Sequence, residues 1–262
     1  MNKKGHLASA VAVGSGVLLF SPSLIASTSL LPALSLIIGA GIGGLSPDFD
    51  HKTGTASNWI QFSAKKRSQF RFLALCLFVV GICIWGWNKY VDPGANSTLM
   101  ESGPLWIGAA VVCSLAARLR TIVLCGLGIL LLYGFFLTNW HWAAAVAGLA
   151  LLIMPFVKHR GIIHSPEFAV LLGYSFWLLG STLSGSVQAT IYGFIIGWWV
   201  HLIGDCFGKD GISSILFPKF KVALKMFQNG GSIENWIARF CWTISFVMLL
   251  MLFSRYSIDL TL

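Results

Sequence analysis

The sequence predicts an all-α integral membrane protein, a polytopic helical bundle with about seven to nine transmembrane or re-entrant helices. Of its 262 residues, 56% are hydrophobic and only 10% are charged, and the mean hydropathy is +0.78. Soluble domains carry about 25% charged residues. Because the chain has too few charges to cover a water-facing globule, this composition excludes a soluble enzyme and a disordered regulator.

Nine apolar runs have lengths suited to crossing a bilayer, about 17–25 residues each. The first two are separated by Ser and Pro residues and could form a re-entrant hairpin, and the short fourth run could fail to cross. We expect one helical membrane domain over residues 1–262, with 208–237 as a basic cytoplasmic or interfacial segment. The runs cover residues 7–26, 30–46, 70–88, 103–117, 121–138, 140–157, 167–184, 187–207 and 238–254.

The positive charges indicate how the runs are oriented. The net charge is +9, and if every run crosses, the Lys and Arg residues that flank the runs fall on one side. The opposite loops hold Lys89, Asp92 and Glu101 and little else that is charged. The positive-inside rule makes the basic side, with the N-terminus, cytoplasmic. Because the basic residues are spread over several loops, the charge does not favour nucleic acid as a partner.

Histidine and aspartate residues gather at the ends of runs on this same side. Five of the six His residues map there, whereas His141 maps to the far side between two Trp residues, as is typical of an interfacial aromatic belt. His201 and Asp205 are four residues apart and so share one helix face. The candidate metal ligands are His6, Asp48, Asp50, His51, His159, His164, His201 and Asp205.

Imidazole and carboxylate groups together suit a divalent metal, with Zn²⁺ expected first and Mn²⁺ or Fe as alternatives. Eight candidates exceed the needs of one tetrahedral ion, so they could hold one or two ions, a pair lying about 3.5–4 Å apart. Some of them could instead orient a ligand imidazole. Each pair alone is also explained by an ordinary helix cap or hydrogen bond. Their joint placement at one membrane edge favours the metal, because ionisable clusters beside hydrocarbon are costly.

Three other features bear on a phosphorylated substrate. Arg160 lies between two candidate ligands and could bind a phosphate with two hydrogen bonds, or it could be an ordinary positive-inside charge. Ser165, followed by Pro166, is typical of a helix N-terminus. Residues 217–227 mix aromatic and Lys residues, which predicts an amphipathic helix in the lipid headgroup plane, with an ordinary cytoplasmic loop as the alternative.

These motifs together resemble the YdjM/DUF457 family of inner-membrane proteins, which are described as metal-dependent hydrolases. The resemblance rests on Gly5-His6, the Pro47–His51 turn (PDFDH), the His159–Ser165 loop (HRGIIHS), and the helix with Gly197, His201 and Asp205. It implies a bacterial inner-membrane location. The family's distant similarity to zinc-dependent phospholipase C and P1 nuclease implies an all-helical site and a phosphodiester or phospholipid substrate. Those soluble enzymes tend to use Glu where this chain has Asp205.

We therefore expect a membrane-embedded, metal-dependent hydrolase of a phosphoester, in a lipid or lipid-linked substrate, with membrane lipid as a partner and no indicated oligomeric state. Metal-bound water would be the nucleophile, one of Asp48 or Asp50 would act as general base, and Arg160 would stabilise the charge on phosphate. The alternatives are an ion or metal transporter and a structural membrane partner protein with a metal site. A transporter is less favoured because no second polar cluster is seen at the far side.

Overall fold

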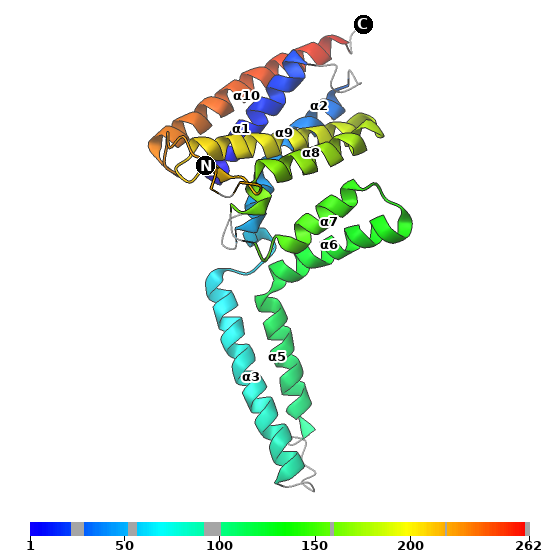
Figure 1. The fold of residues 1–262 in the computed structure, drawn as a ribbon, viewed down its shortest axis with the longest axis vertical. Helices are drawn as coiled ribbons and strands as arrows, with labels where there is room; N and C mark the ends of the chain where they lie inside the picture. Colours follow the sequence, from blue (N-terminus) through cyan, green and yellow to red (C-terminus); the bar gives the residue numbers. More distant parts are fainter. Residues whose placement is uncertain (22–28, 52–56, 92–100, 158–159, 218, 260–262) are drawn as a thin grey trace. The chain divides into compact units, whose positions relative to one another are not determined.

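The computed structural model describes residues 1–21, 29–51, 57–91, 101–157, 160–217 and 219–259. Within these residues it contains nine α-helices, three short 3-10 helices and one two-stranded hairpin (Figure 1). This confirms the prediction of an all-α fold. The α-helices are α1 (Lys3–Phe20), α2 (Leu30–Leu45), α3 (Ala64–Tyr90), α5 (Gly103–Ala117), α6 (Leu119–Thr138), α7 (Ala143–Ile153), α8 (Pro166–Ser181), α9 (Gly185–Phe207) and α10 (Ser232–Asp259).

Each predicted apolar run overlaps one of these helices, and residues 22–26 of the first run lie outside the described residues. Within the described ranges, five segments are long and apolar enough to cross a membrane: α2 with the 3-10 helix η2 (Pro47–Asp50), α3, α6, α9 and α10. Helices α5 and α7 are apolar but shorter. α7 covers only part of its predicted run, because the chain turns at Trp140–Trp142 before it and Pro155 follows it. The sidedness of the helices stays a prediction.

The helices pack into two compact units, and the prediction of one membrane domain with a basic segment at 208–237 stays a prediction. One unit comprises Met1–Lys52 and Leu127–Leu262, and the other comprises Thr53–Gly126. In the first unit α2 packs against α9 and α1 packs against α2, α9 and α10, with α8 beside α9 (Figure 1). In the second unit α3 and α5 pack along each other. Helix α6 begins in the second unit and ends in the first.

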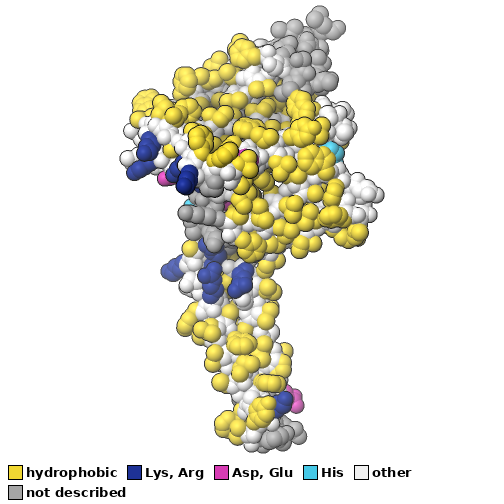
Figure 2. Space-filling view, viewed as in Figure 1, with side chains coloured by type: hydrophobic (Ala, Val, Ile, Leu, Met, Phe, Trp, Pro, Cys, Tyr) yellow, Lys and Arg dark blue, Asp and Glu magenta, His cyan; other side chains and the backbone are white. Residues whose placement is uncertain are grey.

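Hydrophobic side chains cover much of the visible face of each unit (Figure 2). On α3, Phe72 and Leu75 are 70% and 60% exposed, and Gly81 is the only buried residue of that helix. Soluble monomers rarely expose contiguous apolar patches of this extent. The surface therefore agrees with a protein whose helices are surrounded by lipid, as the composition predicts.

Helices α2 and α9 approach each other through glycine residues spaced four apart. Gly39 and Gly43 lie on α2, and Gly193 and Gly197 lie on α9. A Cβ atom at any of these positions would overlap a backbone carbonyl of the facing helix. Small residues at this spacing let membrane helices pack backbone to backbone. The carbonyls that approach these glycines belong to Thr190, Phe194, Leu36 and Ala40. This glycine seam fixes the C-terminal ends of α2 and α9 relative to each other.

The predicted amphipathic helix over residues 217–227 is not formed in the described part of that segment, so this prediction is wrong. Instead, β1 (Ile212–Ser213) pairs antiparallel with β2 (Lys221–Val222). The amide of Leu224 donates to the carbonyl of Cys206, and that of Met226 donates to Phe207. Because the last carbonyls of α9 take these amide hydrogens, the segment runs extended along the end of α9 rather than forming a helix of its own.

Candidate metal centre

The ends of several elements bring histidine and aspartate side chains into one buried cluster in the first unit. His6 comes from the first turns of α1, Asp48 from η2, and His164 from the 3-10 helix η4 (Ile162–His164). His201 and Asp205 come from the last turns of α9. Four of the five side chains are at most 1% exposed, whereas that of Asp48 is 25% exposed. Five of the eight predicted ligands therefore meet in one cluster, while the membrane side that this cluster faces stays a prediction.

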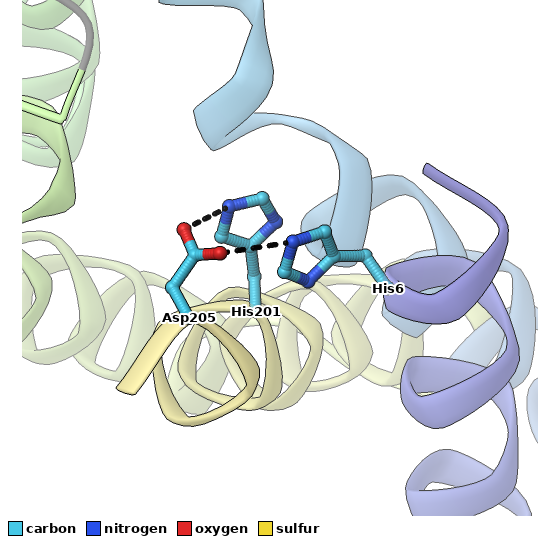
Figure 3. A group of neighbouring side chains, drawn as sticks. All are labelled: His6, His201 and Asp205. Carbon is cyan, nitrogen blue, oxygen red and sulfur yellow. Dashed lines mark ion pairs between the residues drawn. The ribbon is translucent and has the colours of Figure 1, made fainter. Parts of the chain in front are cut away.

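The two ring nitrogens of His201 have different surroundings. Its Nδ1 lies 2.7 Å from the carbonyl oxygen of Gly44, which can only accept, so Nδ1 carries the hydrogen and donates it. The Nε2 atom then presents its lone pair to the cluster and lies 3.4 Å from Oδ2 of Asp205. Figure 3 shows His201 and Asp205 rising from the same helix face toward each other. Gly44 follows Gly43 at the end of α2. The close packing of the glycine seam therefore brings the Gly44 carbonyl within reach of the His201 ring.

A carboxylate lies behind the ring of His164. Its Nδ1 lies 3.1 Å from Oδ2 of Asp50, and its Nε2 lies 3.2 Å from Nε2 of His201. A carboxylate behind a histidine ring is the usual arrangement for fixing the orientation of a metal-ligating imidazole. The next residue, Ser165, accepts a hydrogen bond from the amide of Phe168 at 3.1 Å, which confirms it as the N-cap of α8.

The carboxylate of Asp205 uses its two oxygens differently. Around Oδ1 lie the amino group of Met1 at 2.7 Å, a guanidinium nitrogen of Arg160 at 3.2 Å and Nε2 of His6 at 3.3 Å. The buried Oδ2 accepts no hydrogen bond from any residue that the structure describes. It lies 3.8 Å from Nε2 of His164, in addition to its approach to His201. A buried, unpartnered carboxylate oxygen facing two imidazole nitrogens is the arrangement a cation would satisfy.

His6 stacks on His201, with ring centroids 3.7 Å apart and an angle of 11° between the planes. Figure 3 shows the two rings side by side, with a dashed line for the 3.3 Å approach of His6 Nε2 to Oδ1 of Asp205. Burial, together with the nearby His201, lowers the pKa of His6 to about 4. The ring is therefore neutral near pH 7, the form in which imidazole can bind a metal.

Two overlapping groups in the described residues bring their ligand atoms within 4.8 Å of one another: His6 with His201 and Asp205, and Asp48 with His164 and His201. Oδ1 of Asp48 lies 3.8 Å from Nε2 of His201 and 3.9 Å from Nε2 of His164. Of the other predicted ligands, Asp50 contacts the far side of the His164 ring, and His51 belongs to neither group. His159 lies outside the described residues.

Arg160 reaches the cluster, as its place between two candidate ligands suggested. One guanidinium nitrogen lies 3.2 Å from Oδ1 of Asp205, and the other lies 3.1 Å from Oδ2 of Asp210. The backbone of Arg160 has a left-handed φ of 60°, and its amide donates to Oδ2 of Asp50 at 3.2 Å. Asp50 therefore holds both the His164 ring and the turn that carries Arg160.

Sequence reasoning missed several residues that support the cluster, among them Gly44, Asp210 and Glu234. Glu234 is fully buried at the start of α10, where it accepts the amide hydrogens of Asn2 and, at 2.6 Å, Gly230. It thereby ties the beginning of α1, which carries His6, to α10. Glu234 had one available signal, since it is among only nine acidic residues and directly precedes an apolar helix. The backbone carbonyl of Gly44 had none.

Fold and cluster together define a polytopic helical membrane protein with a buried histidine–carboxylate centre. The chain belongs to the YdjM inner membrane protein family, whose sequence profile matches residues 1–260. The family resemblance inferred from the motifs is thus confirmed. The family name also supports the prediction that this is an inner-membrane protein. No curated protein and no solved structure gives a significant match to the chain.

Proposed function

We propose that this protein is a membrane-embedded, metal-dependent hydrolase that cleaves a phosphoester in a lipid or lipid-linked substrate. One observation supports it above all: the Nε2 atoms of His164 and His201 converge on the unpartnered Oδ2 atom of Asp205. Neutral imidazoles and a carboxylate form the donor set of hydrolytic zinc sites. Zn²⁺ is the first candidate, with Mn²⁺ or Fe as alternatives.

A divalent ion in such a site supplies a nucleophile by lowering the pKa of its bound water toward about 7. Asp48 is the better placed of the two predicted general bases. Its side chain is 25% exposed, so it can meet both water and substrate, whereas Asp50 is buried behind the His164 ring. Asp48 would accept the proton of the attacking water. Asp50 would keep His164 in the orientation that ligation requires.

Arg160 would stabilise the charge that develops on the phosphate. Its guanidinium is 14% exposed and lies beside the Asp205 carboxylate, so it can face a substrate at the cluster. A preorganised cation in a water-poor site is among the larger contributions to catalysis. A lipid substrate is favoured because the cluster lies at the ends of helices apolar enough to cross a bilayer, so a headgroup could enter from the membrane.

The test compares purified wild-type protein with His201→Ala and a control, His141→Ala, whose histidine lies outside the cluster. The probes are bis(p-nitrophenyl) phosphate and mixed micelles of phosphatidylglycerol, assayed with added Zn²⁺ or Mn²⁺. Loss of a residue behind a metal ligand typically costs about 10–100-fold, so we expect His201→Ala, which removes a ligand, to lose at least that much rate and His141→Ala to keep its rate. Equal rates in His201→Ala and wild type would overturn the proposal. So would metal uptake into sealed vesicles without hydrolysis, which would favour a transporter.

A further inference from the structure

The two candidate metal groups share one residue, His201, and only its Nε2 atom is free to bind a metal. Its other ring nitrogen donates to the Gly44 carbonyl at 2.7 Å and has no lone pair left for a metal. Each group needs His201, and the single lone pair of Nε2 can be given to one ion at a time. We infer that the cluster holds one ion per chain rather than a pair, and that this ion lies on the His164 side of His201.

The distances favour the His164 side. Donor atoms around a tetrahedral zinc ion with bonds of about 2.0–2.1 Å lie about 3.3 Å from one another. The Nε2 atoms of His164 and His201 are 3.2 Å apart, and Oδ2 of Asp205 lies 3.4 and 3.8 Å from them. Oδ1 of Asp48 lies 3.8 and 3.9 Å from the same two nitrogens. The two imidazoles and the Asp205 carboxylate surround one position closely enough for small side-chain rotations to complete three bonds to an ion. The fourth position then stays open for water, with Asp48 beside it as the proposed base.

The His6 side is unfavourable for a second ion. A cationic group, the Arg160 guanidinium, already lies 3.2 Å from Oδ1 of Asp205, the oxygen that His6 approaches. A divalent ion bound there would lie close to this positive charge in a buried site, where their repulsion is poorly screened. In addition, His6 stacks on His201, so their ring nitrogens project side by side rather than toward a common point. His6 therefore acts as a positioning residue for His201 and Asp205.

This inference rests on the proposed metal-dependent function, and the experiment separates the two. Protein is loaded with excess Zn²⁺, freed of unbound metal and analysed for zinc per chain, for wild type, His164→Ala, His6→Phe and the control His141→Ala. Phe keeps the aromatic stacking of His6 but has no donor nitrogen. We expect about one ion per chain in wild type, His6→Phe and His141→Ala, and less than a tenth of an ion in His164→Ala.

Two ions per chain in wild type would overturn the inference, and so would an ion kept by His164→Ala but lost from His6→Phe. If His164→Ala does not give monodisperse protein, a Co²⁺ titration of the wild type decides instead. Its visible absorption should stop rising at one equivalent, and a break at two would overturn the inference. Two ions with hydrolysis would leave the proposed function standing, whereas one ion without hydrolysis would leave only the single-ion site.

Discussion

Two helix pairs of this protein use close packing for different ends. α2 and α9 meet along the glycine seam, and both helices end in residues of the cluster or its support. α3 and α5 also pack closely, with Gly81 against the backbone of Gly103, yet the rest of α3 has no buried residue. Neither α3 nor α5 contributes to the two metal-binding groups found in the described residues.

The difference shows what the seam provides beyond helix association. A buried ligand set requires its donor atoms to stay within a few tenths of an ångström of their positions, so the backbones that carry them must have little freedom. The seam restricts the backbones of α2 and α9 by direct contact between them. The hydrogen bond to the Gly44 carbonyl then fixes the His201 ring relative to α2. A helix surrounded by lipid, such as α3, meets no such demand and can present large apolar side chains outward.

The largest expected effect comes from adding a single methyl group to each region. Gly43→Ala would place a Cβ against the Phe194 carbonyl, whereas a Cβ at Gly86 of α3 meets nothing within 4 Å. Overpacking a rigid contact costs about 1–3 kcal/mol, and replacing an unconstrained helix glycine by alanine gains up to about 1 kcal/mol. We expect Gly43→Ala to lower the melting temperature in detergent and Gly86→Ala to leave it unchanged or raise it. Melting-temperature shifts of the same sign and size in both variants would show that the seam glycines are not needed for close helix packing.

A second, more local effect concerns the carboxylate behind His164. Asp50→Asn keeps the shape of the side chain but removes the charge that faces Nδ1 of His164. Loss of such a supporting carboxylate typically weakens metal affinity by about 10–100-fold. Competition with a chelator measures this, with Glu101→Gln, an exposed acid of the other unit, as the matched control. An unchanged affinity in Asp50→Asn would mean that His164 does not depend on Asp50 for its orientation.

Much of this architecture could be predicted from the sequence because its cause is local. Apolar run length locates the nine helices, and the four-residue spacing of His201 and Asp205 puts both on one face. The N-cap at Ser165 follows from its own hydroxyl and the proline after it. Motifs at the ends of neighbouring runs also predicted that His6, His164 and His201 would meet, since successive crossings return the chain to the same side.

The remainder depends on contacts between distant parts of the chain. Gly44 and His201 are separated by 157 residues, and no local pattern marks a backbone carbonyl as a hydrogen-bond acceptor for a particular ring. The segment 217–227 has the composition of an amphipathic helix, but the end of α9 takes its amide hydrogens. Ring orientation likewise decides which of the eight predicted ligands point their donor atoms at a common position. The spacing of the residues in the sequence does not reveal this orientation.

The smallest expected effect compares the helix caps of the two units. Ser165 accepts the Phe168 amide at 3.1 Å and is fully buried, whereas the exposed Ser63 accepts the Lys66 amide of α3 at 3.4 Å. Replacing a serine N-cap by alanine costs about 0.5–2 kcal/mol, and a buried amide left without its acceptor belongs at the upper end of that range. We expect Ser165→Ala to lower the free energy of unfolding by about 1–2 kcal/mol, and Ser63→Ala by less than about 0.5 kcal/mol.

Denaturant titration in detergent micelles would measure both losses, and a chelator competition on the same samples would add a second comparison. Ser165 directly follows His164, so a frayed start of α8 would also loosen that ligand and lower metal affinity, whereas Ser63 lies in the other unit and should not affect it. Equal losses of unfolding free energy in Ser165→Ala and Ser63→Ala would contradict the view that the helices of the first unit are held more rigidly than those of the second. A stability loss in Ser165→Ala without any change in metal affinity would instead show that the 3-10 turn holding His164 is fixed by Asp50 and Gly161 rather than by the helix that follows it.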